Sequence, residues 1–173
     1  MEQFNLEKSG GDRPLALTAA LFQMIGMHFK LYPQVKRGKI TATDKALRQV
    51  ADIECSDNEG KVVIAIEVKD RTVTVSDLKE KLRTSREQGI REVFFVSGRG
   101  TRESEGVPER AAREFAAGQN LYVFTLMELA RPILALAGEE ARRDFLIFVG
   151  QQLDAHSETK HRLAWRKALQ EMA

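Results

Sequence analysis

The sequence of 173 residues contains one cysteine, Cys55, so no disulfide can form within the chain. It also lacks an uninterrupted apolar stretch of the roughly 18 residues that a membrane-spanning helix needs. The first residues, MEQFNLEKSGGDR, are polar and do not have the pattern of a secretory signal. These absences predict a protein of a reducing, cytoplasmic compartment that has no membrane partner.

A strong excess of charge of one sign is also missing. The formal net charge is only +2, and acidic residues are interspersed among the basic ones. The phosphate-binding motif GxxxxGK[ST] does not occur, which argues against a P-loop NTPase and a nucleotide cofactor. Hydrophobic residues make up 43% and charged residues 30%, so a globular protein with a core is expected rather than a disordered chain.

The length suits one domain, which we expect over residues 14–173 after a flexible leader over residues 1–13. Helices and strands alternate in the pattern of the sequence, which predicts an α/β fold with a mixed central sheet and C-terminal helices. The predicted helices cover residues 14–31, 76–88 and 108–117 and most of 127–172, and the predicted strands cover residues 35–41, 49–55, 61–69, 92–97 and 121–125.

Two charged residues stand out on the strand KVVIAIEVK, which is otherwise apolar. Glu67 and Lys69 are two positions apart and therefore share one face of this strand. The turn at 57–60 folds the preceding strand back antiparallel. A turn of two or four residues pairs Asp52 with Ala65 and places Asp52 diagonally across from Glu67, whereas a three-residue turn reverses the parity and destroys the site.

Charges on so apolar a strand need partners, and two explanations are open. One is a cross-strand salt bridge from Lys69 to Glu67 or Asp52. The other is a divalent metal held by Asp52, Glu67 and the carbonyl group of Val68, since hard oxygen ligands of this kind suit Mg²⁺ or Mn²⁺. In the second case Lys69 would orient or help to deprotonate an attacking water.

Asp52, a turn, and then Glu67-Val68-Lys69 together resemble the D…(D/E)-x-K motif of PD-(D/E)xK nucleases. The wider sequence resembles SacI-type restriction endonucleases over roughly residues 12 to 170, in RPLALTAALFQMIG, QVADIECSDNEGKVVIAIEVKDRTVTVSDLKEKL, REVFFVS, AAREFAAGQNLYV and HRLAWRKAL. The resemblance implies a restriction-endonuclease-like three-layer α/β/α fold, with Asp52, Glu67 and Lys69 as catalytic residues. It also implies Mg²⁺-dependent cleavage of duplex DNA, with Mn²⁺ as a substitute metal, by a homodimer.

The chain departs from the nuclease pattern at two places. The residue before Asp52 is Ala51 rather than proline. Many relatives also add an acidic residue from the first helix, but residues 14–31 contain none. Glu7 is a distant candidate for that role, and Glu54, on the same strand face as Asp52, is either an extra ligand or a solvated charge.

Basic residues near the motif are candidates for contacts with DNA phosphates. The helix over 76–88 is expected to point Lys79, Lys81, Arg83 and Arg86 outward. The segment 98–102 is either a phosphate-contacting loop or a plain surface loop. The predicted DNA-binding residues are Arg71, Lys79, Arg83, Arg86, Arg99 and Arg102. A repair or nonspecific nuclease of the same superfamily and an inactive DNA-binding relative are the alternative functions.

Overall fold

The computed structural model describes residues 1–7, 9–38, 49–99 and 103–171. The helices are α1 (Glu2–Leu6), α2 (Asp12–Phe29), α4 (Val75–Glu87), α5 (Val107–Ala116), α6 (Leu126–Leu136), α7 (Glu139–His156) and α8 (Thr159–Gln170). The strands are β1 (Gln34–Arg37), β2 (Ile53–Ser56), β3 (Val62–Lys69), β4 (Glu92–Ser97) and β5 (Asn120–Thr125). In the ranges described, no helix is both long enough and apolar enough to cross a membrane.

The strands form a mixed sheet in the order β1-β2-β3-β4-β5. β1, β2 and β3 pair antiparallel, whereas β3, β4 and β5 pair parallel. Parallel neighbours need a crossover connection, and α4 and α5 lie in the connections from β3 to β4 and from β4 to β5. The predicted α/β fold with a mixed sheet is therefore confirmed.

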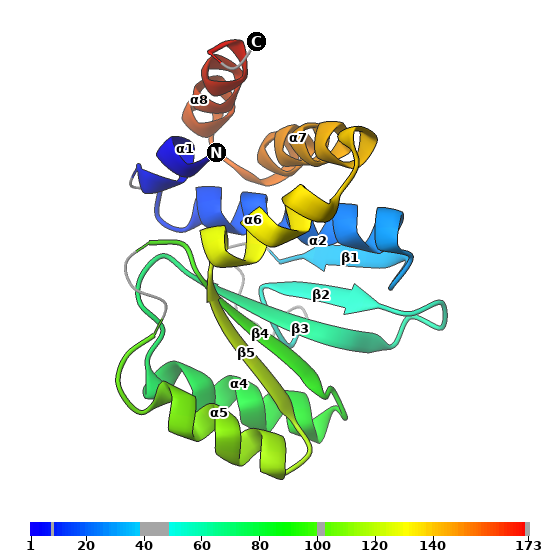
Figure 1. Cartoon of the computed structure of the whole chain (residues 1–173), viewed down its shortest axis with the longest axis vertical. Coiled ribbons are helices and arrows are strands. Elements are labelled where there is room, and N and C mark those ends of the chain that lie inside the picture. Colours follow the sequence, from blue (N-terminus) through cyan, green and yellow to red (C-terminus); the bar gives the residue numbers. More distant parts are fainter. Residues whose placement is uncertain (8, 39–48, 100–102, 172–173) are drawn as a thin grey trace.

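Helices cover both faces of the sheet. α4 and α5 lie on one face, whereas α2, α6 and α7 lie on the other, with α1 and α8 beyond them (Figure 1). Val93 and Phe95 of β4 pack in the apolar cluster on the α4 side, and Phe94 and Val96 pack in the larger cluster on the α2 side. This alternation is what a central strand buried on two faces requires, and it confirms the three-layer arrangement.

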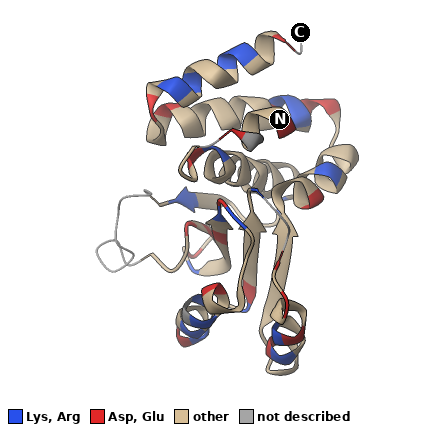
Figure 2. Cartoon of the chain, turned by 90° about the vertical axis from the view of Figure 1, so that its left-hand side faces the viewer, with Lys and Arg blue, Asp and Glu red and all other residues tan. Residues whose placement is uncertain are grey.

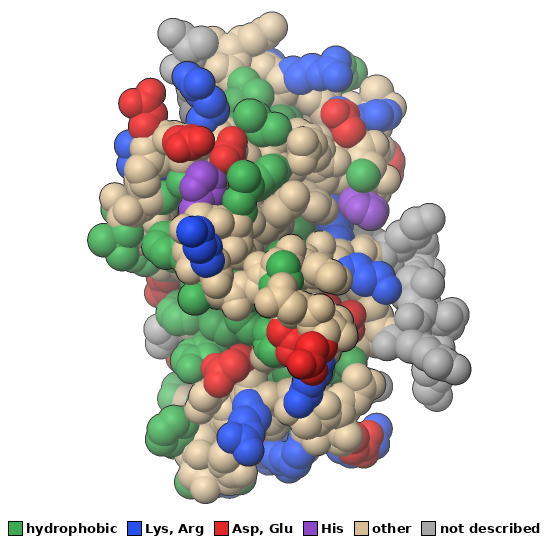
Figure 3. All heavy atoms as spheres, turned by 90° about the vertical axis from the view of Figure 1, so that its right-hand side faces the viewer, with side chains coloured by type: hydrophobic (Ala, Val, Ile, Leu, Met, Phe, Trp, Pro, Cys, Tyr) green, Lys and Arg blue, Asp and Glu red, His purple; other side chains and the backbone are tan. Residues whose placement is uncertain are grey.

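The larger core reaches the surface between α2, α6 and the sheet. An apolar hollow of about 300 Å³ opens there, with Phe29, Leu31, Phe94 and Leu136 among its lining residues. Leu136 and Leu31 are 81% and 65% exposed. Figure 3 shows hydrophobic side chains gathered on this side of the molecule.

Residues 1–13 differ from the flexible leader that the sequence predicted, because they hold α1 and the first residues of α2. Phe4 is buried, and its ring meets the ring of Trp165 in α8 edge-on at 5.1 Å. The guanidinium group of Arg13 lies over the Phe4 ring and donates a hydrogen bond to the Phe4 carbonyl. One aromatic ring and one paired guanidinium thus anchor a segment that shows no apolar periodicity.

Candidate active site

The turn between β2 and β3 has three residues, the length for which strand parity predicts that Asp52 and Glu67 lie on opposite faces. The Asp57 N–H donates to the Lys61 carbonyl at 3.0 Å, so the turn itself consists of three residues, 58–60. Gly60 occupies a positive φ of 79° that favours glycine, and the Asp57 carboxylate accepts hydrogen bonds from the Glu59 and Lys61 N–H groups. A three-residue turn alone would put Asp52 and Glu67 on opposite faces.

A β-bulge directly after the turn restores the parity. Ser56 pairs with Val62, but Cys55 pairs with Ile64, so Val63 is an extra residue in β3. One extra residue moves the pairing by one position, which exchanges the two faces of the strand for every pair that follows. The turn and the bulge each move the pairing by one residue, so together they leave Asp52 and Glu67 on the same face.

Asp52 and Glu67 consequently meet, in a register two residues from the predicted one. Ala65 pairs with Glu54 rather than with Asp52, and the same register places Asp52 directly opposite Glu67. The predicted Asp52–Ala65 pair is thus wrong, whereas the shared face is confirmed.

Asp52 lies just before β2 and is tied to the neighbouring strand. Its Oδ2 accepts a hydrogen bond from the Val68 N–H at 2.9 Å. Burial, and after it the negative charge of Glu67, raise the pKa of Asp52 to about 6, against the opposing effects of the Val68 N–H, Lys69 and Lys81. This carboxyl group therefore takes up a proton in mildly acidic solution.

Glu67 is 2% exposed and has an ammonium group beside each of its oxygens. Lys69 Nζ donates to Oε2 at 2.9 Å, and Lys81 Nζ lies 2.8 Å from Oε1. The contact with Lys81 is an ion pair outside regular hydrogen-bond geometry, so Oε1 is a buried oxygen held by charge alone. Burial acts to lower the pKa of Lys69, but the charge of Glu67 and its hydrogen bond outweigh that effect and raise it. Lys69 is therefore a cation at neutral pH.

Lys81 is the site residue that the sequence argument missed, since it was expected to point outward. Its side chain is only 14% exposed, and its Nζ also donates to the Val50 carbonyl at 3.0 Å. The helical spacing does indicate that Lys81 is near the buried face of α4. Leu78, Leu82 and Ser85 are buried, and Lys81 lies three residues after Leu78 and four before Ser85, beside this buried stripe.

A hollow of about 340 Å³ opens beside the C-terminal end of β3. Asp52, Val68 and Lys69 line it together with Gly10 and Gly11, which precede α2. Three of the predicted site residues therefore face one solvent-accessible space, and Glu67 lies behind Lys69 on the α4 side.

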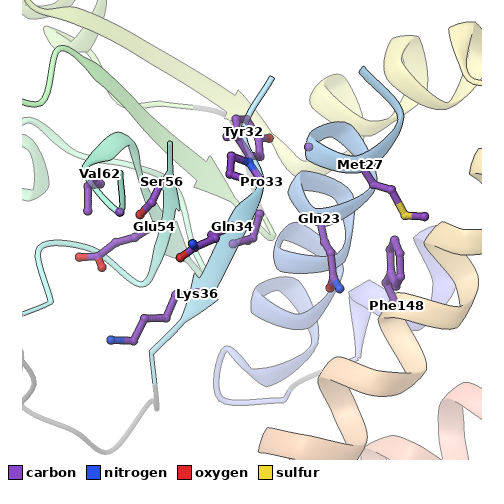
Figure 4. Close-up of a pocket in the computed structure, with 13 residues that line it drawn as sticks. Gln23, Met27, Tyr32, Pro33, Gln34, Lys36, Glu54, Ser56, Val62 and Phe148 are labelled. Atoms are coloured by element: carbon purple, nitrogen blue, oxygen red, sulfur yellow. The ribbon is translucent and has the colours of Figure 1, made fainter. Parts of the chain in front are cut away.

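A larger hollow of about 890 Å³ lies at the β1 edge of the sheet. Figure 4 shows Gln34, Lys36 and Glu54 on its strand side and Gln23 and Phe148 on its helix side. Among the described residues, its lining contains no histidine or cysteine and no pair of carboxylates. Glu54 was a candidate extra ligand, but its Oε1 accepts a hydrogen bond from the Val50 N–H at 2.6 Å. The end of β3 is therefore the stronger candidate for the site.

Three predicted DNA-binding residues lie near this end of β3. Arg71 makes two hydrogen bonds to Asp77 in the first turn of α4, at 2.8 and 2.7 Å. Arg99 makes two to Asp70, both at 2.7 Å. Lys79 is exposed two residues after Asp77. Arg71 lines the hollow, and Arg99 pairs with Asp70, which also lines it.

Arg83 and Arg86, which were also predicted to bind DNA, are not brought to the site. Arg83 pairs with Glu87 on the outer side of α4 at 2.6 Å. Arg86 contacts Glu114 of α5 and Gln119, which directly precedes β5. Gln119 therefore lies at the N-terminal end of the parallel strands, whereas the hollow lies at the C-terminal end of β3. Figure 2 shows basic and acidic positions mixed along α4 and α5, at the lower end of the view. Arg102 lies outside the described residues.

An acidic residue on the first long helix is present, two positions before the predicted start of that helix. Asp12 is the first residue of α2, and its Oδ1 lies 3.4 Å from the Arg37 guanidinium. Burial lowers the pKa of Arg37 to about 10, against the attraction of Asp12 and Asp52. Arg37 therefore links Asp12 electrostatically to the site. Glu7, the candidate from the sequence, is exposed and pairs with Arg13 instead.

The oxygens at the end of β3 suit a divalent cation. Among the described residues, no three histidine, cysteine, aspartate or glutamate side chains gather as a metal cluster. The candidate ligands are thus two carboxylates, of Asp52 and Glu67, and the Val68 carbonyl. Glu67 Oε1 is a buried oxygen that forms an ion pair with Lys81 and no regular hydrogen bond, so a bound cation could coordinate it. Hard oxygen donors of this kind fit Mg²⁺ or Mn²⁺.

Comparison with known proteins gives one family. The model of the SacI restriction endonuclease C-terminal domain matches residues 1–99. The matched span runs from α1 to the end of β4 and contains the two carboxylates and both lysines described above. The resemblance seen further along the sequence, to about residue 170, is not part of this match. No curated protein matches the chain.

Proposed function

The chain belongs to the family of the SacI restriction endonuclease C-terminal domain, and on this premise we propose that it is a metal-dependent endonuclease that cleaves duplex DNA at specific sites. The observation that carries the proposal is the convergence of Asp52, Glu67 and Lys69 at one end of β3. A short motif is common by chance, but two carboxylates in direct register, with an ammonium group on one of them, support metal-assisted hydrolysis of a phosphodiester.

Asp52, Glu67 and the Val68 carbonyl would hold Mg²⁺, for which Mn²⁺ can substitute. The bound ion would supply positive charge to the scissile phosphate and lower the pKa of the attacking water. Lys69 lines the same hollow as Asp52 and Val68, so its ammonium group can orient that water. Because Lys69 is hydrogen-bonded to Glu67 in the structure, it must turn from Glu67 toward the phosphate to do so.

We propose a homodimer as the active form. A palindromic DNA site has a twofold axis, and a symmetric dimer presents one copy of the same active site to each strand. Each subunit would then cut one strand.

Incubation with mixed plasmid DNA and Mg²⁺ tests the function directly. We expect discrete fragments from the wild type, because site-specific cleavage cuts each plasmid at a fixed set of positions. The variant Asp52→Ala/Glu67→Ala, which loses both carboxylates, should yield none. A smear would point instead to a nonspecific or repair nuclease. Intact DNA with Mg²⁺ and with Mn²⁺ would contradict the enzyme and leave a DNA-binding relative.

The salt dependence of DNA binding tests the assignment of phosphate contacts. Each phosphate that is neutralised contributes a slope of about −0.9 to the plot of log K against log salt concentration. Lys79→Ala should therefore make the slope shallower by about 0.9. Arg86→Ala is the matched control on the same helix, and its slope should equal that of the wild type, since Arg86 is held by Glu114 away from the site. Fluorescence anisotropy in Ca²⁺ measures both, and equal slopes for Lys79→Ala and the wild type would remove Lys79 from the interface.

A further inference from the structure

Two lysines share the Glu67 carboxylate, and their surroundings differ. Lys69 is 27% exposed, lines the hollow, and donates its hydrogen bond to Glu67. Lys81 is 14% exposed, comes from α4 and is absent from the hollow lining. It has a second acceptor in the Val50 carbonyl, 3.0 Å away. Lys69 can therefore turn into the hollow, whereas Lys81 is held behind the site.

Lys81 forms an ion pair with Glu67 at the oxygen that Lys69 does not contact. Its Nζ lies 2.8 Å from Oε1, outside regular hydrogen-bond geometry, and donates a hydrogen bond to the Val50 carbonyl. The ammonium group thus neutralises Glu67 at Oε1. A divalent cation that binds to this oxygen has to compete with that ammonium group.

The two carboxylates and the two lysines balance in charge without any metal. Asp52 and Glu67 carry two negative charges when ionised, and Lys69 and Lys81 carry two positive ones. A divalent cation that binds between the carboxylates adds charge to a group that is already neutral. It is repelled most by an ammonium group that cannot leave, because charges in a buried site are poorly screened.

We propose that Lys81 is a built-in counter-ion of Glu67, which competes with the divalent metal and so sets the metal concentration at which the site fills. This inference rests on the proposed function, since it takes the metal site of the nuclease as given. When the cation binds to Oε1, Lys81 keeps its hydrogen bond to Val50, so the competition costs no rearrangement of α4. Lys81 then acts on metal affinity, and Lys69 acts on the phosphate.

The test is the affinity of the protein for Mn²⁺ alone, measured by calorimetry without DNA at pH 8. Lys81→Met keeps the length of the side chain and removes its charge, and we expect it to bind Mn²⁺ about tenfold more tightly than the wild type, or better. Lys79→Met removes the same charge from the exposed side of α4, and its Mn²⁺ affinity should stay within about twofold of the wild type because water screens it. If Lys81→Met does not fold, Lys81→Gln keeps a donor for the Val50 carbonyl and should show the same tightening.

Unchanged or weaker binding of Mn²⁺ by both Lys81 variants would overturn the inference. Detectable binding by Lys81→Met but not by the wild type would support it, because the counter-ion would then hold the site closed to the metal. The proposed function fails separately. A wild type that binds Mn²⁺ and does not cut any DNA refutes the nuclease, while the comparison of affinities still decides the role of Lys81.

Discussion

Replacement of Lys69 by alanine is expected to slow single-turnover cleavage of duplex DNA by about 10²- to 10⁴-fold, the usual contribution of a general acid or base. Lys69 lines the hollow with Asp52, and its Nζ lies 2.9 Å from Glu67 Oε2. A lysine that only formed a salt bridge would affect the free energy of unfolding and leave the cleavage rate nearly unchanged. The rate in Mg²⁺ therefore separates the two explanations that the sequence leaves open.

Two further substitutions sharpen this experiment. Lys69→Arg should not restore cleavage, because the planar guanidinium is larger and does not give up a proton near neutral pH. Lys61→Ala, at the exposed start of the same strand segment, removes a lysine far from Asp52 and should cut like the wild type. Gel shifts in Ca²⁺ should show DNA binding by all three variants. A Lys69→Ala protein that cuts within about threefold of the wild type would exclude Lys69 from the chemistry.

The shared face of Asp52 and Glu67 was predictable from strand periodicity, but the route to it was not. Strand alternation fixes which residues share a face only while the register is regular. The turn of three residues follows from Asp57 and Gly60, whereas nothing in the sequence marks Val63 as the extra residue of a bulge. An even turn predicts the same face with a different register, because the odd turn and the bulge each move the pairing by one residue and together restore the face.

Elements with strong local patterns were predicted closely, and those held by single contacts were not. β4 occupies Glu92–Ser97 as expected, since a run of Val and Phe can hardly form anything else. α1 depends on the edge-on contact between Phe4 and Trp165, which is distant in the sequence and leaves no periodic trace. The start of α2 at Asp12 rather than Pro14 is a difference of two residues, yet it adds an acidic residue to the helix end near the site.

Lys81 shows why a helical wheel read by hydrophobicity alone loses site residues. A lysine beside an inward stripe is normally assigned to solvent, because burying an ammonium group is unfavourable without a partner. Its partner here, Glu67, lies on a strand that precedes the helix and faces it. The ion pair forms only when α4 packs against the sheet, so the pattern of either segment alone does not predict that Lys81 and Glu67 are buried together.

Asn in place of Asp52 is expected to abolish cleavage and, in the metal-free protein, to raise the free energy of unfolding at pH 8 by about 2–3 kcal/mol. The folded state raises the pKa of Asp52 from 3.8 to about 6, mainly through burial and then through Glu67. Above pH 6 the ionised Asp52 carboxylate therefore lowers the free energy of unfolding. The favourable contribution of the protonated form is complete below pH 3.8 and is lost as the pH rises through 6.

The advantage of Asp52→Asn over the wild type should therefore disappear as the pH falls from 8 to 4, which urea denaturation at several pH values measures. Asp52→Ala is the matched control. It removes the same charge but also the acceptor of the Val68 N–H, so it should be less stable than Asp52→Asn at every pH by about 1–3 kcal/mol. Addition of Mn²⁺ should reverse the order at pH 8, because only the wild type keeps both carboxylates and gains stability by binding the ion. An advantage of Asp52→Asn that does not change with pH would show that the buried charge is not its source, and stabilisation of both variants by Mn²⁺ as large as that of the wild type would place the metal elsewhere.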